Sequence, residues 1–153
     1  MKSEKTVRIG GACGFLGDTS ISTPQLIGGG DVDYIVYDYL AEVTMSLLAR
    51  VKAKRPDMGY AHYFTDVIIE ENIKDISEKG IRIITNAGGV NPNACRDKIL
   101  EIAKNEGIEI KVVDRVATAI EFNVNQLHPK LPQNHPGSCF ILGNEIRNLA
   151  TCE

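Results

Sequence analysis

Residues 81–92 read Ile-Arg-Ile-Ile-Thr-Asn-Ala-Gly-Gly-Val-Asn-Pro. The first five residues are rich in β-branched side chains and predict a strand. Asn91 and Pro92 occupy the positions preferred by an N-cap and a first helical residue, so a helix is expected to begin here. A strand that passes through a short turn into a helix is the unit from which parallel sheets are built. This stretch therefore predicts an α/β fold.

Two other stretches have the same form, an apolar run followed by a polar turn. Residues 7–9, Val-Arg-Ile, precede a glycine-rich turn over residues 10–18, and residues 32–37, Val-Asp-Tyr-Ile-Val-Tyr, precede a turn over residues 38–44. If the three runs are parallel strands of one sheet, all three turns lie at its carboxyl edge. Open α/β sheets bind ligands at that edge. We therefore expect three separated parts of the sequence to line one crevice.

The rest of the sequence continues the alternation of strands and helices. Ile108, Ile110 and Val112 alternate with polar residues and predict a fourth strand, and residues 139–142 are a candidate fifth. The apolar residues of 60–79 do not form one stripe, which indicates either a kink or burial on two sides. The segments expected to be helical are 20–27, 40–55, 60–79, 92–106 and 116–127.

This order of elements defines the expected fold class. Strands that alternate with helices imply right-handed crossovers and a mostly parallel sheet. We predict a Rossmann-like, three-layer α/β domain with about four to five strands and helices on both faces. The domain is expected to occupy residues 1–127. Residues 128–153 contain Pro129, Pro132 and Pro136 and have no periodicity, so a loop or disordered tail is expected there, with a short edge strand as an option.

Composition and charge exclude several classes of function. The 17 basic and 20 acidic side chains leave a formal charge of −3, which argues against the clustered basic face of a nucleic-acid-binding protein. No apolar stretch is long enough to span a membrane, and the N-terminus lacks the apolar core of a signal peptide. The 4 cysteines have no zinc-site spacing. A cytoplasmic protein without a membrane or nucleic-acid partner is therefore expected.

The glycine-rich turn is a candidate anion-binding loop. Gly11, Gly14 and Gly17 have the GxxGxxG spacing of extended short-chain dehydrogenases, and glycines let backbone N–H groups approach a phosphate. Asp38 ends the next strand, where a ribose-binding carboxylate is expected. An NAD(P)-binding, oxidoreductase-like domain is therefore one hypothesis. Against it, Asp18 puts negative charge where the pyrophosphate would lie, and the sequence has no Tyr-x-x-x-Lys pair.

Three carboxylates are expected at the carboxyl edge and are our candidate catalytic residues. Asp18, Asp38 and Glu42 could jointly hold a divalent cation through oxygen ligands, or one of them could act as a general base. Glu42 also has a simpler role, because a carboxylate in the first turn of a helix offsets its macrodipole. Asp38 has no comparable packing role. Neither the metal nor the cofactor follows from the sequence.

The third turn is a candidate ligand-binding loop. Gly88 and Gly89 could form an anion-binding nest, and Asn86 offers an amide that has no evident capping role. Asn91 is a ligand candidate too, although we favour its role as a helix N-cap. In the first turn, Cys13 would be a nucleophile if a nearby helix N-terminus lowered the pKa of its thiol; packing is the simpler role.

Taken together and in this order, the three turns resemble the N-terminal domain of the acyclic terpene utilisation (AtuA-like) family. The stretches that carry the resemblance are 7–18, 32–42, 59–61 and 80–92, within a match over residues 7–113. The resemblance implies a role in bacterial breakdown of acyclic terpenoids such as citronellol and geraniol, without implying a particular reaction. The pocket positions that it implies are Gly11, Gly14, Gly17, Asp18, Asp38, Glu42, Asn86 and Asn91.

The sequence departs from the family pattern after the fourth predicted strand. Residues 112–116 read Val-Val-Asp-Arg-Val where members have a Gly-Asp-Asp turn, and the sequence ends at Glu153 where members continue into a much longer domain. Three hypotheses follow. The first is a domain that binds a small terpenoid or acyl-CoA related metabolite, and the second is the NAD(P)-binding domain. The third is a truncated, non-catalytic remnant or the subunit of a homo-oligomer. Whether the chain is an enzyme stays open among them.

Overall fold

The structure, a computed structural model, describes residues 6–115 and 139–143. The helix expected over residues 116–127 lies outside the described residues. So does the tail expected from residue 128 onward, apart from residues 139–143.

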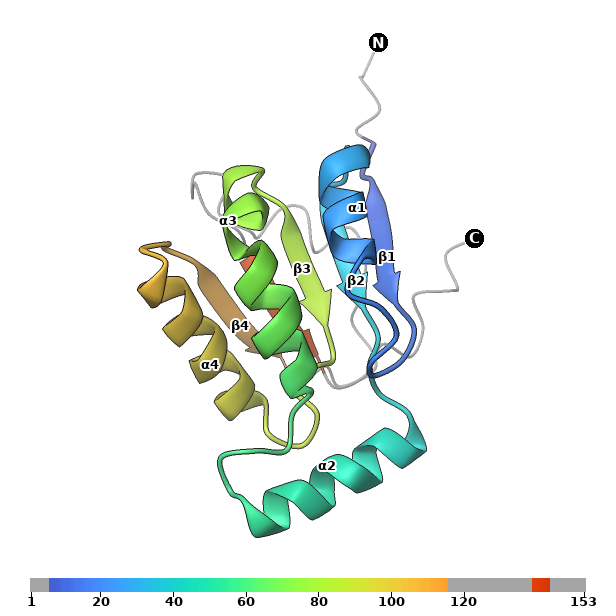
Figure 1. Cartoon of the computed structure of the whole chain (residues 1–153), viewed down its shortest axis with the longest axis vertical. Coiled ribbons are helices and arrows are strands. Elements are labelled where there is room, and N and C mark those ends of the chain that lie inside the picture. Colours follow the sequence, from blue (N-terminus) through green and yellow to red (C-terminus); the bar gives the residue numbers. More distant parts are fainter. Residues whose placement is uncertain (1–5, 116–138, 144–153) are drawn as a thin grey trace.

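A single parallel sheet organises the described residues (Figure 1). Its strands are β1 (Ile9–Cys13), β2 (Tyr34–Tyr37), β3 (Arg82–Thr85), β4 (Lys111–Arg115) and β5 (Cys139–Gly143). The strand order is β1-β2-β3-β5-β4, and every pairing is parallel. The predicted α/β class and the predicted parallel pairing are therefore confirmed, and all the carboxyl ends lie at one edge of the sheet.

The first strand begins later and extends further than the sequence suggested. Residues 7–9 were the expected strand, but β1 continues to Cys13 and takes in Gly10 and Gly11. A Cβ atom on Gly10 would lie 2.9 Å from Leu26 Cδ2. The glycine at this position therefore lets the helix after β1 pack closely on the strand, and Gly11 belongs to the strand rather than to the turn.

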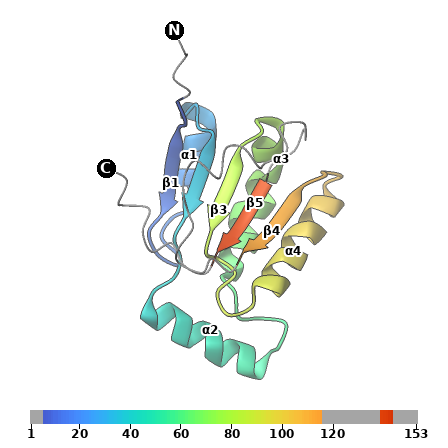
Figure 2. The same cartoon turned by 180° about the vertical axis from the view of Figure 1, so that it is seen from behind.

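The helices are α1 (Ser22–Gly29), α2 (Glu42–Lys54), α3 (Glu70–Glu78) and α4 (Pro92–Asn105), with a π-helical segment η1 (Phe64–Ile69) before α3. Figures 1 and 2 show α1, α3 and α4 on one face of the sheet. The strands β1, β2 and β3 follow one another in a single direction, so right-handed connections place their helices on the same side. The expectation of helices on both faces is therefore not met by the helices of the described residues.

Buried apolar residues fill the space between the sheet and these helices. Ile35 of β2 and Ile83 of β3 are register partners, and both are fully buried. Ile99 of α4 is fully buried as well, as its spacing with Cys95 and Ile102 predicts. The apolar pattern that identified these elements in the sequence is thus the pattern of the core.

The π-helical segment explains why residues 60–79 show two apolar stripes. Phe64 and Ile68 are buried in η1, and Ile73 and Ile76 are buried in α3. A π-helix closes i→i+5 hydrogen bonds and therefore shifts the positions that face the core relative to an α-helix. A change of helix type within the segment therefore accounts for the broken apolar stripe of residues 60–79.

Helix α2 has a different setting from the other helices. It lies beyond the carboxyl edge of the sheet rather than on a face (Figure 1). Leu48 is its buried residue, whereas Val43 is 72% exposed. The helix forms where its periodicity predicts, but the core does not cover its apolar stripe. Among the described residues, no helix has the length and apolar character that crossing a membrane requires.

Candidate functional site at the carboxyl edge of the sheet

Asp38 and Asn86 lie side by side because they follow two paired strands. Tyr37 and Thr85 are the last register partners of β2 and β3, and the next residue of each strand is Asp38 or Asn86. Asn86 Nδ2 donates a hydrogen bond to Asp38 Oδ1 at 2.6 Å. Asn86 Oδ1 accepts a hydrogen bond from the backbone N–H of Tyr39 at 2.8 Å. Two of the three predicted turns therefore meet at this pair.

The burial of the two side chains separates their roles. Asn86 is 4% exposed, and both ends of its amide are bonded within the protein. Asp38 is exposed, and among the described residues nothing except Asn86 hydrogen-bonds its carboxylate. Asn86 was the favoured ligand contact in the third turn, but its geometry suits holding Asp38 in place. Asp38 Oδ2 has no hydrogen-bond partner among residues 6–115 and 139–143.

The first turn joins this pair through Cys13. The backbone N–H of Asp38 donates to Cys13 O at 3.3 Å, and Cys13 Sγ donates to Asp38 O at 3.7 Å. Burial raises the pKa of the Cys13 thiol, and its hydrogen bonds with Tyr39 and the backbone of Asp38 do not reverse that effect. The following helix begins only at Ser22. The condition for a nucleophilic Cys13, a thiol pKa lowered by a helix N-terminus, is therefore not met, and the packing role favoured from the sequence fits the structure better.

The glycine-rich turn closes on its own carboxylate. Gly14 N–H donates to Asp18 Oδ2 at 3.0 Å, and Asp18 N–H donates to Phe15 O at 3.3 Å. Gly17 allows the turn through its φ of +84°. The dinucleotide fingerprint needs a helix that starts at the turn, whereas α1 starts at Ser22. The Asp18 carboxylate thus accepts a hydrogen bond from Gly14 N–H, a backbone group that a bound phosphate would need as a donor.

The glycines of the third turn are explained by close packing. Gly89 has a φ of +52°, and a Cβ atom there would lie 2.6 Å from Leu48 Cδ1 and 2.8 Å from Gly59 O. A Cβ atom on Gly88 would lie 2.9 Å from Pro92 Cβ. Gly89 N–H donates to Asn86 O at 3.1 Å, so this amide is paired within the turn.

The neighbouring backbone amides of this turn are paired too. Val90 N–H donates to Gly59 O at 3.0 Å, and Asn91 N–H donates to Gly88 O at 2.9 Å. An anion-binding nest presents successive N–H groups outward. Here they hold the turn to itself and to the segment before η1, which favours a structural role for Gly88 and Gly89.

Asn91 occupies the N-cap position of α4 but does not cap it with its side chain. No side-chain hydrogen bond of that kind forms, and Pro92 is at the first helical position as predicted. Asn91 Nδ2 instead donates to Pro56 O at 2.9 Å and to Met58 O at 2.7 Å. The predicted position is confirmed and the predicted cap hydrogen bond is wrong, because the amide holds the loop that follows α2.

The third candidate carboxylate does not join the other two. Glu42 is exposed in the first turn of α2, as its sequence position predicts. Asp18 is bonded to its own turn and Asp38 to Asn86. Within the described ranges 6–115 and 139–143, no three His, Cys, Asp or Glu side chains group in a way that could hold a metal ion. The three carboxylates therefore share an edge of the sheet rather than a common centre.

An aromatic cluster lies beneath the Asp38 turn and was missed in the sequence. Tyr39 and Phe64 have ring centroids 5.7 Å apart, and Tyr37 and Phe64 have centroids 5.2 Å apart. The hydroxyl of Tyr37 lies 2.9 Å from Thr23 Oγ1. Burial raises the pKa of both tyrosines. In the sequence, Tyr37 and Tyr39 look like ordinary strand residues, because the ring that joins them into a cluster, that of Phe64, comes from a distant segment.

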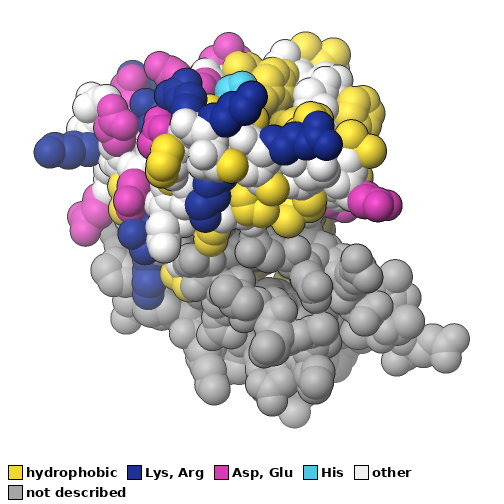
Figure 3. Space-filling model, turned by 90° about the horizontal axis from the view of Figure 1, so that it is seen from below, with side chains coloured by type: hydrophobic (Ala, Val, Ile, Leu, Met, Phe, Trp, Pro, Cys, Tyr) yellow, Lys and Arg dark blue, Asp and Glu magenta, His cyan; other side chains and the backbone are white. Residues whose placement is uncertain are grey.

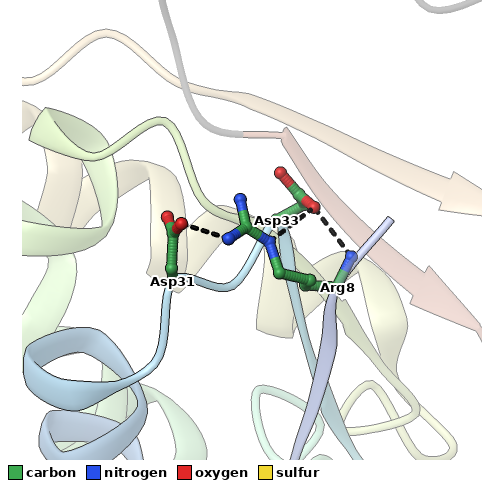
Figure 4. A network of polar contacts seen from close by, with 3 residues as sticks. All are labelled: Arg8, Asp31 and Asp33. Atoms are coloured by element: carbon green, nitrogen blue, oxygen red, sulfur yellow. Dashed lines mark hydrogen bonds and ion pairs between the residues drawn. The ribbon is translucent and has the colours of Figure 1, made fainter. Parts of the chain in front are cut away.

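A hollow of about 450 Å³ lies at the opposite, amino edge of the sheet. Its lining includes residues 28–30, Asp31 and Lys79. Figure 4 shows Arg8 between Asp31 and Asp33; its guanidinium pairs with Asp31, and its backbone N–H donates to Asp33 Oδ2 at 2.7 Å. These contacts join the starts of β1 and β2. None of the predicted site residues lines this hollow.

A family model described as "Acyclic terpene utilisation family protein AtuA" matches residues 7–134. No curated protein and no solved structure matches the chain.

Proposed function

Since this chain belongs to the acyclic terpene utilisation family, AtuA, we propose that it binds a small metabolite of terpene utilisation at the carboxyl edge of its sheet. The ligand that we favour is an acyclic terpenoid with a hydroxyl group. Asp38 is the residue proposed to contact that group, and Asn86 is the residue proposed to position Asp38.

The hydrogen bond between Asn86 and Asp38 is the observation that carries the proposal. Asn86 Nδ2 holds Asp38 Oδ1 at 2.6 Å, so the carboxylate has a fixed orientation before a ligand arrives. Its second oxygen, Oδ2, has no hydrogen-bond partner among the described residues. A carboxylate oxygen accepts hydrogen bonds, so the group that it selects is a donor such as a hydroxyl. A preoriented acceptor loses little entropy when that donor binds.

The charge of the turns favours a neutral ligand over an acyl-CoA. Asp18, Asp38 and Glu42 are all exposed acidic residues of the first two turns. Carboxylates repel the phosphate groups of coenzyme A, and the N–H groups of Gly89, Val90 and Asn91 in the third turn are already paired within the protein. Phe15, which is 57% exposed in the first turn, offers apolar surface to a hydrocarbon chain.

Isothermal titration calorimetry with citronellol or geraniol tests this proposal, with acetyl-CoA as the competing ligand. Asp38→Asn should weaken binding of the alcohol by roughly tenfold or more, since the bond lost is one to a charged acceptor. Asp57→Asn is the matched control, because Asp57 is an exposed aspartate that pairs with Arg55. Equal loss in both variants, or binding of acetyl-CoA alone, would contradict the assignment.

An NAD(P) site is the second candidate, and one observation favours it. Asp38 is exposed directly after β2, which is where a dinucleotide fold places the carboxylate that binds ribose hydroxyls. The self-closed turn at Gly14 and Asp18 is the reason that it ranks second. NAD or NADP at millimolar concentration should raise the melting temperature if this site exists. An unchanged melting temperature removes the candidate.

A further inference from the structure

Two glycines at the end of α1 are explained neither by backbone conformation nor by packing. Gly28 and Gly29 are the last two residues of the helix, and neither has a positive φ. A Cβ atom at either position would meet nothing within 4 Å. Glycine is less favourable than alanine within a helix, so the pair weakens α1 without a local structural reason.

The same two glycines line the hollow of about 450 Å³ at the amino edge of the sheet. A hollow of this size is large enough for a small molecule. Ile27 and Ile81, which are 4% and 3% exposed, contribute apolar lining. Because Gly28 and Gly29 carry no side chains, the backbone of α1 itself forms part of the wall. Glycine is the residue that lets a backbone come close to a ligand.

The end of α1 supplies hydrogen-bond acceptors to this hollow. The last carbonyl groups of a helix have no partner within the helix. Ile27 O accepts a hydrogen bond from Lys79 Nζ. The carbonyl groups of Gly28 and Gly29 have no hydrogen-bond partner within residues 6–115 and 139–143. Asp31 adds a carboxylate directly after them in the lining.

The charges around the hollow are balanced. Lys79, the C-cap residue of α3, lines it together with Asp31. The Arg8 guanidinium lies between Asp31 and Asp33 and pairs with both (Figure 4). An anion is disfavoured because α1 and α3 both end here, and the carboxyl end of a helix is the negative end of its macrodipole. A simple cation would be repelled by Lys79.

We propose that this hollow binds a small zwitterion of the α-amino acid class. The ammonium group of the ligand has three donors, which the carbonyl groups of Gly28 and Gly29 and the Asp31 carboxylate accept. The carboxylate of the ligand accepts a hydrogen bond from Lys79 Nζ, which has donors beyond the one that it directs at the backbone. An apolar side chain of the ligand contacts Ile81.

This site lies at the opposite edge of the sheet from Asp38. Strand β2 begins at Tyr34, beside the hollow, and ends at Tyr37, directly before Asp38. Figure 3 shows the carboxyl end of the molecule, where Lys and Arg side chains lie among apolar side chains. An amino acid can therefore bind at the hollow whether or not Asp38 binds a terpenoid.

Isothermal titration calorimetry of the complete chain with L-leucine tests the proposal. L-leucine should bind, whereas N-acetyl-L-leucine, which lacks the ammonium group, and L-leucinamide, which lacks the carboxylate, should each bind at least about tenfold more weakly. Lys79→Met should weaken binding of L-leucine by about tenfold but should leave the weaker binding of L-leucinamide unchanged. Lys104→Met is the matched control, since Lys104 lies in the last turn of α4, and it should bind L-leucine as wild type does.

The glycines give a second readout that a merely structural role would not produce. Gly28→Ala and Gly29→Ala should each raise the melting temperature, because alanine is the better helix former. At least one of the two should also weaken binding of L-leucine, because its methyl group enters the wall of the hollow. Stability and binding should thus change in opposite directions.

Four results would overturn the proposal. The first is no heat of binding with L-leucine at concentrations up to about 10 mM. The second is N-acetyl-L-leucine that binds as tightly as L-leucine. The third is equal binding of L-leucine by wild type and Lys79→Met. The fourth is binding that both glycine variants leave unchanged.

Discussion

Asn86 Nδ2 lies 2.6 Å from Asp38 Oδ1, and this hydrogen bond joins the ends of β2 and β3. The same amide receives the backbone N–H of Tyr39 at 2.8 Å. One buried side chain thus fixes both the carboxylate and the backbone of the Asp38 turn. If Asp38 binds the ligand, Asn86 sets the orientation of the carboxylate that the ligand meets.

Replacing Asn86 should therefore destabilise the domain as well as the site. Asn86→Ala leaves the buried N–H of Tyr39 without an acceptor, and the expected loss is about 1–3 kcal/mol in the free energy of unfolding. Urea denaturation measures it. Asn93→Ala, an exposed asparagine at the start of α4, should change stability by less than about 0.5 kcal/mol. A similar change in the two variants would show that the Asn86 hydrogen bonds contribute little.

Gly89 should tolerate a side chain much less well than Gly107, although both have a positive φ. The φ values are +52° and +68°, so each position disfavours alanine by about 1–2 kcal/mol. At Gly89 the new Cβ atom would also meet Leu48 and Gly59 O, whereas at Gly107 it would meet nothing within 4 Å. Gly89→Ala should thus cost more than Gly107→Ala by chemical denaturation. Equal costs would mean that the turn has room to move.

Stability should fall at high pH because of the tyrosines on either side of Asp38. Burial raises the pKa of Tyr37 and Tyr39 in the folded chain, whereas the unfolded chain releases these protons near the ordinary value of about 10. The stability due to the neutral hydroxyls is complete below that value and is lost as the pH rises above it. The loss can reach about 1.4 kcal/mol per pH unit for each tyrosine.

Urea denaturation between about pH 8 and pH 11, on either side of the ordinary tyrosine pKa of about 10, measures this dependence. Tyr39→Phe removes one of the two titrating hydroxyls, so the free energy of unfolding should fall less steeply with pH. A variant with the same slope as wild type would contradict the burial of the Tyr39 hydroxyl as its cause.

The sequence predicts the fold well wherever local pattern and tertiary structure agree. The β-branched run before Asn86 and the Asn91-Pro92 pair correctly locate β3 and the start of α4. The carboxyl edge follows from the parallel pairing, so the closeness of Asp38 and Asn86 was predictable in outline. The direction of each side chain was not, because it depends on which backbone groups of distant segments need a partner.

Asn91 and the glycine turns show where this limit lies. The sequence identifies Asn91 as a cap, yet its amide binds Pro56 O and Met58 O from a loop more than thirty residues away. GxxGxxG spacing is a local pattern, and whether its amides are free depends on Asp18, which takes the N–H of Gly14. The helix type change in η1 is likewise visible only as a broken periodicity.

Mapping the terpenoid on the protein by ¹H–¹⁵N correlation NMR tests the central claim most directly. With citronellol or geraniol, amide shifts should change at Asp38, Tyr39 and the turn from Gly14 to Asp18, and Asp38→Asn should abolish these changes while Asp57→Asn retains them. Shift changes confined to the hollow at residues 28–30, or changes at the carboxyl edge that survive Asp38→Asn, would contradict the claim.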